Sequence, residues 1–102
     1  MFDQLDIVEE RYEQLNELLS DPEVVNDSDK LRAYSKEQAD LQKTVDVYRE
    51  YKQVKEDLAD IDDMLRETKD KDEIDMLKEE ASNLKPQVPE LEEQLKFLLL
   101  SL

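Results

Sequence analysis

The chain has 102 residues, a net charge of −15 from 14 basic and 29 acidic side chains, and no Gly, Cys, His or Trp. Without Gly there is no phosphate-binding P-loop and no GxGxxG dinucleotide turn, because both need backbone that approaches phosphate without a Cβ. Without Cys and His the usual zinc sites, thiol nucleophiles and His-based triads are excluded. The composition argues against a self-contained enzyme, and no cofactor is expected.

The apolar residues argue against disorder and against a membrane protein. Although 42% of the residues are charged, Leu, Val, Ile and Phe supply 28 of the 102, above the level of about 20% that is typical of unstructured chains. The longest apolar run, Phe97–Leu100, is far shorter than the roughly 20 residues that span a bilayer. We expect a folded cytoplasmic protein. Both halves of the chain are acidic, so DNA binding by bulk charge is not expected.

Residues 2–20 are predicted to form an amphipathic helix, because apolar residues recur there at steps of three and four. The opposite side carries an acidic row at helical neighbour spacing, made of Asp6, Glu10, Glu13 and Glu17. Such a row is ordinarily a solvated face that favours solubility. The alternative is a docking surface for a basic protein, and these four are therefore candidate partner-contact residues.

Two clusters of capping residues follow. In Ser20–Glu23, Asp21 can cap a new helix and Pro22 suits its first position, which predicts a short helical turn over 22–25. Asn26–Asp29 is the second cluster. It precedes a segment without Gly or Pro, which predicts a helix over 29–68, about 60 Å long at 1.5 Å per residue.

The apolar row of this long helix is irregular at one place. Val45, Tyr48, Tyr51 and Val54 follow one another in three successive steps of three, whereas a regular heptad alternates three and four. We expect a change of packing partner between Tyr48 and Val54. The tyrosines lie on or beside the apolar seams and are interpreted as packing residues rather than as a platform for stacking bases.

A tight reversal is predicted at 67–72, which lacks apolar residues. Asp70 or Asp72 can cap the helix that follows, and Asp70, Asp72 and Glu73 form a second group of candidate partner-contact residues. The last helix is predicted over 73–101, where apolar residues step three and four from Ile74 to Leu102 without error.

Pro86 and Pro89 lie on the outer face of this last helix. Outward prolines would curve it toward its partner, with a kink at 86–89; a full break near Lys85 is the alternative. Helices joined by a short polar turn pack antiparallel, so Val54–Leu65 should face Ile74–Leu84. The expected fold is all-α: an elongated antiparallel hairpin with an additional N-terminal helix in a three-helix arrangement, and a monomer.

The densest carboxylates are Asp57, Asp60, Asp62 and Asp63. They lie within one helical pattern, without the Gly of an EF-hand turn, and residues one or two apart on a helix do not converge. We interpret them as a solvated face and expect no metal site. An enzyme that uses carboxylates and a metal ion ranks as a third possibility.

Several stretches together resemble the amino-terminal helical domain of bacterial class I peptide chain release factors. They are Arg11–Asp27, Leu31–Glu37 with Leu41, Val45–Lys52, Glu79-Glu80 and Leu98–Leu100, and they cover nearly the whole chain. The early position of Ser20-Asp21-Pro22 resembles the type that reads UAA and UAG.

The resemblance implies a noncatalytic role in translation termination. The family reads the stop codon with one domain and releases the peptide with a Gly-Gly-Gln loop in another, and a chain without Gly cannot contain that loop. It also implies a ribosomal partner, a basic ribosomal protein at the stalk base with adjacent rRNA, although the acidic exterior does not explain contact with RNA. The ending Leu100-Ser101-Leu102 departs from the family junction and suggests an excised domain or a truncated gene product. A free-standing coiled-coil adaptor or oligomerisation module is the alternative.

Overall fold

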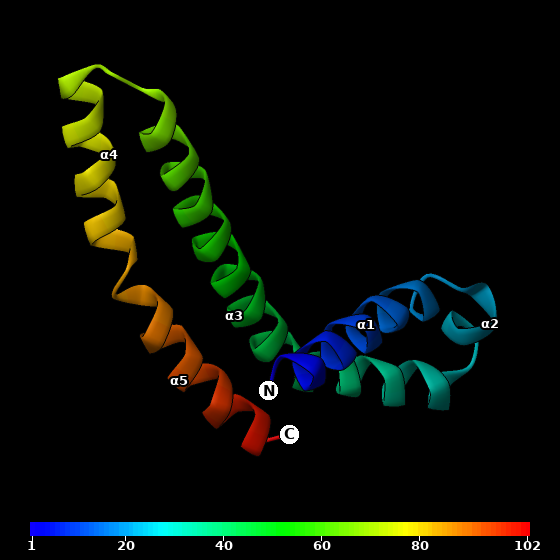
Figure 1. Cartoon of the computed structure of the whole chain (residues 1–102). Coiled ribbons are helices and arrows are strands. Elements are labelled where there is room, and N and C mark those ends of the chain that lie inside the picture. The colour runs from blue at the N-terminus through cyan, green and yellow to red at the C-terminus, as the bar shows by residue number, and fades with distance from the viewer.

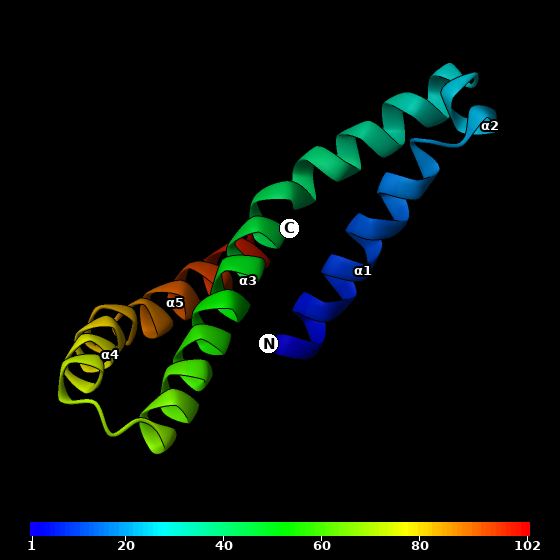
Figure 2. The ribbon, with the colours of Figure 1, turned by 90° about the horizontal axis from the view of Figure 1, so that it is seen from above.

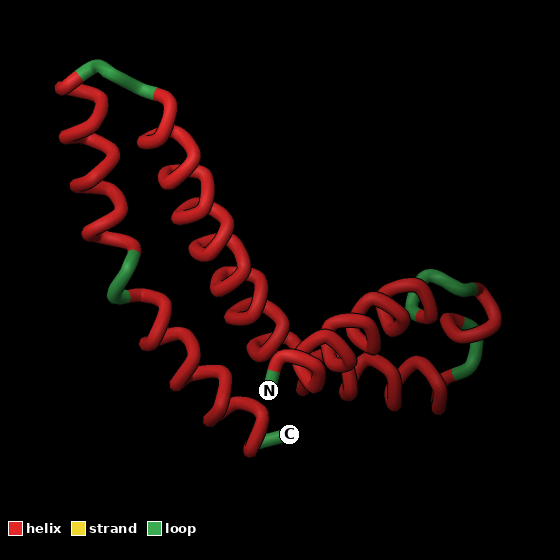
Figure 3. The backbone as a smooth tube through the Cα atoms, in the orientation of Figure 1, coloured by secondary structure: helices red, strands yellow, loops and turns green.

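The computed structural model describes residues 1–102 and contains five helices and no strand, which confirms the all-α class (Figures 1 and 3). The radius of gyration is 18.9 Å and the extents are 61 × 28 × 18 Å, whereas a compact domain of this length has a radius of gyration of about 13 Å. The molecule is therefore elongated. The helices are α1 (Phe2–Leu18), α2 (Pro22–Val25), α3 (Ser28–Glu67), α4 (Lys71–Leu84) and α5 (Gln87–Leu100).

Aspartate residues are the N-caps of three of the five helices. Asp21 accepts a hydrogen bond from the backbone N–H of Glu23 at the start of α2, Asp27 caps α3, and Asp70 caps α4. Each carboxylate satisfies N–H groups that have no partner within the helix and interacts favourably with the helix dipole. The local sequence signals at the starts of α2 and α3 therefore correspond to real caps.

Helix α3 packs against all the other helices and forms two antiparallel pairs, one with α1 and one with α4 and α5. Helix α1 lies along its first half, and α4 and α5 return along its second half (Figures 1 and 2). Consequently α1 begins and α5 ends near the middle of α3.

The three long segments meet in one apolar cluster at this middle region. Tyr48 and Tyr51 of α3 are 5% and 7% exposed, although both lie in a helix that is otherwise largely solvated. The Phe2 ring stacks on Tyr51 with 5.4 Å between ring centroids. The predicted change of packing partner between Tyr48 and Val54 occurs here, because α1 and α5 pack on α3 at the same level. The buried members are Leu5, Val47, Tyr48, Tyr51, Val54, Leu91 and Leu95.

A second apolar cluster joins α3 to α4 farther from the centre. Its buried members are Ile61, Leu77 and Ala81, so the second half of α3 faces α4 as the antiparallel hairpin predicts. Leu84 packs against both clusters and connects them. The apolar face of α4 that a coiled-coil adaptor would use to dimerise therefore packs against α3 of the same chain.

The expected continuous helix over 73–101 is wrong, and the alternative break near Lys85 is what the structure shows. Helix α4 ends at Leu84 and α5 begins at Gln87, with a turn at Lys85 and Pro86 (Figure 3). Two prolines explain the break, because neither has a backbone N–H to donate. Pro86 leaves the carbonyl of Ser82 without its helical hydrogen bond, and Pro89 does the same to the carbonyl of Lys85. Each proline ring also clashes with the carbonyl four residues before it and pushes it away. Both prolines are exposed, on the outer face as expected.

Candidate docking surface on α1

The inner face of α1 packs on α3 and fixes which side chains point outward. Leu5, Tyr12 and Leu15 are buried on this face. Beside them, the Arg11 guanidinium donates two hydrogen bonds to the Glu37 carboxylate, at 2.6 Å from Nε and 2.8 Å from Nη2. These bonds hold the pKa of Glu37 below its ordinary value. A two-point bond of this kind fixes orientation as well as distance, so it sets the rotation of α1 about its axis.

Basic residues of α3 hold two glutamates of α1. Arg49 donates to Glu9 at 3.0 Å and also to Glu13, and Lys52 donates to Glu9 at 2.6 Å. Partial burial alone would raise the pKa of Glu9, but the hydrogen bonds from Lys52 and Arg49 outweigh it and lower the pKa below its usual value. The ion pairs of these two glutamates therefore hold α1 against α3.

Asp6 is also engaged within the molecule. It accepts a hydrogen bond from the hydroxyl of Tyr48, which is buried. Burial, together with this hydrogen bond to a carboxylate, raises the pKa of Tyr48 to about 12. Of the predicted acidic row, Asp6 and Glu13 are thus tied to α3, and a partner would have to compete for them.

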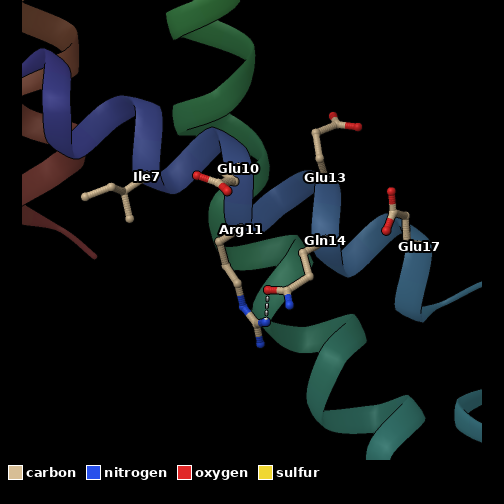
Figure 4. Close-up of a pocket in the computed structure, with 6 residues that line it drawn as sticks. All are labelled: Ile7, Glu10, Arg11, Glu13, Gln14 and Glu17. Atoms are coloured by element: carbon tan, nitrogen blue, oxygen red, sulfur yellow. Dashed lines mark hydrogen bonds between the residues drawn. The ribbon is translucent and has the colours of Figure 1, made fainter.

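The rest of the outward face of α1 is a stripe of side chains with no partner on another helix. Ile7, Glu10, Gln14 and Glu17 recur at steps of three and four and line one shallow depression, with Arg11 at its edge (Figure 4). Ile7 is 66% exposed. Glu10 and Glu17 form no ion pair, and Gln14 is held by Arg11 alone, at 2.6 Å. We call these four residues the α1 stripe.

The second group of candidate residues lies at the turn between α3 and α4, at the end of the hairpin (Figure 1). Asp70 accepts backbone N–H bonds from Asp72 at 2.9 Å and Glu73 at 3.3 Å, so it is the cap of α4. Glu73 accepts a hydrogen bond from the Thr68 hydroxyl at 2.8 Å. Of the three residues in this group, only Asp72 has a side chain without a hydrogen-bond or ion-pair partner. The structure does not bring this group together with the α1 residues.

No group of three or more His, Cys, Asp or Glu side chains is placed to hold a metal ion. Among the four clustered aspartates, Asp57 accepts a bond from Gln53 at 2.9 Å and Asp63 lies 3.5 Å from Arg66. No helix is both long enough and apolar enough to cross a membrane.

The sequence interpretation missed Ile7 as a surface residue. A signal was present, because Ile7 falls outside the apolar positions of residues 2–20 and lies beside Asp6 and Glu10. A single exposed isoleucine is common on protein surfaces, so Ile7 indicates a contact surface only together with the unpaired carboxylates of Glu10 and Glu17 beside it.

Residues 8–102 match the PCRF domain family. The chain belongs to this family. It is similar to peptide chain release factor 1 of Staphylococcus haemolyticus, with 79% identity over 100 residues, to that of Staphylococcus aureus with 77%, and to that of Staphylococcus epidermidis with 76%. No solved structure matches. The resemblance to bacterial class I release factors is therefore confirmed.

The chain spans 28% of the length of these relatives, and 98% of the chain is covered in each comparison. The family match includes the α1 stripe from Glu10 onward and the whole of α3, α4 and α5. It therefore covers the ion pairs that Glu9, Arg11 and Glu13 of α1 form with α3, as well as the hairpin.

Proposed function

We propose that this chain is a noncatalytic docking domain of a translation termination factor, and that its partner is the ribosome in the cytoplasm. The observation that carries the proposal is the family match over residues 8–102 together with relatives named peptide chain release factor 1. A chain without Gly, Cys or His, whose surface offers only charge and apolar contact, fits a domain that is bound rather than one that reacts.

We propose the α1 stripe as the contact with a basic ribosomal protein at the base of the stalk. Glu10 and Glu17 lie two helical turns apart, are exposed and have no internal partner, so a basic surface can pair with them without breaking the fold. Ile7 beside them supplies exposed apolar area that a partner can cover. The net charge of −15 would speed encounter with a basic partner at low salt.

Asp72 at the hairpin end is proposed as a second and separate contact, because it is the one residue of its group that the fold does not use. The other two residues cap or brace the start of α4. Their replacement would weaken the turn before it tested a contact.

The test is binding of this chain to ribosomes in a sedimentation assay over a range of salt concentrations. The double variant Glu10→Gln/Glu17→Gln should bind more weakly than the unchanged chain and show a smaller loss of affinity as salt rises. Glu56→Gln/Asp60→Asn removes the same charge from exposed, unpaired positions on α3 and is the matched control. Equal affinity of the two doubles would show that the α1 stripe is not the contact.

We propose further that the full-length protein terminates translation at UAA and UAG. The support is the name that the relatives share, peptide chain release factor 1. Release from ribosomes stalled at UAA, UAG and UGA, measured with the full-length protein, should be efficient at the first two codons only. Efficient release at UGA would contradict this.

A further inference from the structure

The end of α5 gathers exposed apolar side chains. The last six residues, Phe97–Leu102, carry no charged side chain, in a chain that is 42% charged. Phe97 is 70% exposed, Leu100 88% and Leu102 51%. The other large apolar side chains that are exposed are spread over α1, α2, α3 and α4. We call Phe97, Leu100 and Leu102 the α5 patch.

The α5 patch adjoins the central cluster. Phe97 and Leu100 are three positions apart in one helix, so their side chains are neighbours on its surface. The backbone N–H of Leu102 donates to the carbonyl of Leu99 at 3.3 Å, which keeps Leu102 beside the end of the helix. Leu98 and Leu99 pack against the central cluster. One side of the last turn of α5 therefore lies in the core, and the other side leaves apolar surface in water.

Polar side chains border the α5 patch. A shallow depression lies beside it, where α5 packs on α3, and its lining consists of Lys43, Glu93, Gln94, Phe97 and Leu98. Lys96 pairs with Glu93 at 3.6 Å, so these two charges offset each other. Contiguous apolar surface with a polar border is typical of a contact surface, whereas apolar residues scattered singly are not.

The size of the patch favours an occupant that belongs to the same polypeptide. Three side chains leave roughly a few hundred Å² of apolar surface in water. A stable interface between free partners buries about 800 Å² on each side. A segment tethered to the domain does not lose the translational freedom that a free partner loses on binding, so a smaller area is enough to hold it.

The family relationship supplies such a polypeptide. This chain spans 28% of the length of its release factor 1 relatives and corresponds to their N-terminal region. In a full-length protein the remaining part of the polypeptide therefore follows residue 102. It leaves the domain close to the middle of α3, where the C-terminus lies (Figure 1). Its first segments are thus held next to the α5 patch.

We propose that, in the full-length protein, the α5 patch packs against apolar side chains of the polypeptide that follows residue 102. The contact removes Phe97 and Leu100 from water and extends the central cluster into the next part of the protein. It also fixes the orientation of the helical domain relative to that part. The proposal goes beyond docking to the ribosome and does not depend on it, because the contact lies within one polypeptide.

Amide hydrogen exchange in a full-length protein tests this contact. Such a protein carries this chain in place of the matching residues of peptide chain release factor 1 of Staphylococcus haemolyticus. Exchange over residues 93–100 should be slower in it than in the isolated chain by about tenfold or more. Phe97→Gln/Leu100→Gln should return the exchange rate in the full-length protein to that of the isolated chain, because glutamine suits a helix but not an apolar contact.

The matched control is Ile7→Gln/Met76→Gln. These two residues are 66% and 64% exposed, and their replacement should leave exchange over residues 93–100 slow in the full-length protein. Equally slow exchange in both double variants would mean that the following polypeptide protects α5 without touching the patch. That result would overturn the proposal.

Two further measurements separate other occupants of the α5 patch. Sedimentation equilibrium should show a monomer for the isolated chain, and exchange in the full-length protein should already be slow without ribosomes. A dimer of the isolated chain that Phe97→Gln/Leu100→Gln abolishes would mean that a second copy covers the patch. Slow exchange that begins only when ribosomes are added would mean that a ribosomal component covers it. Either result would overturn the proposal.

The variant itself should fold, because Phe97 and Leu100 are exposed in the isolated chain. Urea unfolding of isolated Phe97→Gln/Leu100→Gln, followed by circular dichroism, should give the same midpoint as the unchanged chain. The exchange experiment contains no ribosomes. Loss of the α5 contact therefore leaves docking through α1 in place, and failure of docking leaves the α5 contact in place.

Discussion

The Tyr48 hydroxyl donates a hydrogen bond to the Asp6 carboxylate across the joint between α1 and α3. Tyr48 comes from the region of α3 on which α5 also packs, and Asp6 comes from the first two turns of α1. This hydrogen bond therefore links the start of α1 to the central cluster, in which α1, α3 and α5 pack together. The two residues lie 42 positions apart in the sequence.

Replacement of Tyr48 by Phe should remove this bond and leave the ring in place. We expect the free energy of unfolding to fall by about 1.5–3 kcal/mol, the range for a hydrogen bond to a charged group. Asp6→Asn should cost less in the Tyr48→Phe background than in the unchanged chain, because the two residues share one interaction. Urea unfolding measures all four proteins, and additive effects of the two changes would contradict the bond.

The same residue predicts an alkaline transition. The pKa of Tyr48 is about 12 in the folded protein against 10.0 ordinarily. A raised pKa in the folded state means that the unfolded chain loses its proton first, so this stabilisation is complete below about pH 10 and is lost as the pH rises toward 12. The unfolding free energy of the unchanged chain should fall more steeply over that interval than that of Tyr48→Phe. Parallel curves would contradict the assignment.

Leu95 and Leu100 offer a matched pair on α5. Leu95 is fully buried and Leu100 is 88% exposed. Leu95→Ala should lower the free energy of unfolding by about 2–5 kcal/mol through lost burial and a cavity in the central cluster. Leu100→Ala should change it by no more than about 0.5 kcal/mol. Similar losses in chemical denaturation would show that α5 does not pack on α3 through this face.

The break between α4 and α5 should depend on both prolines. Pro86→Ala alone restores one backbone donor but leaves the Pro89 ring against the Lys85 carbonyl, and Pro89→Ala alone leaves the defect at Pro86. We expect helical Cα chemical shifts and slowed amide exchange through residues 83–89 only in the double variant. A continuous helix in either single variant would show that one proline suffices.

Local signals predicted much of the fold, and contacts between distant segments account for the rest. A segment without Gly or Pro and two groups of capping residues predict α2 and α3 closely. The apolar steps from Ile74 to Leu102 stay in phase across Pro86, so periodicity alone cannot distinguish a curved helix from a broken one. The answer depends on which backbone carbonyls each proline ring displaces.

The candidate surface was predicted only in part for the same reason. Asp6, Glu10, Glu13 and Glu17 look alike in the sequence, because their spacing places all of them on the polar side of one helix. Arg49 and Tyr48 of α3 engage two of them and leave the other two free, and only the fold brings these partners together.

The most direct test of the docking function is a peptide-release assay on ribosomes stalled at a UAA codon. The chain alone should release no peptide, and in excess it should slow release by full-length peptide chain release factor 1 of Staphylococcus haemolyticus by competing for the same ribosomal surface. Glu10→Gln/Glu17→Gln should compete less well. Peptide release by the chain alone, or undiminished release by the full-length factor when the chain saturates the ribosomes, would contradict the account.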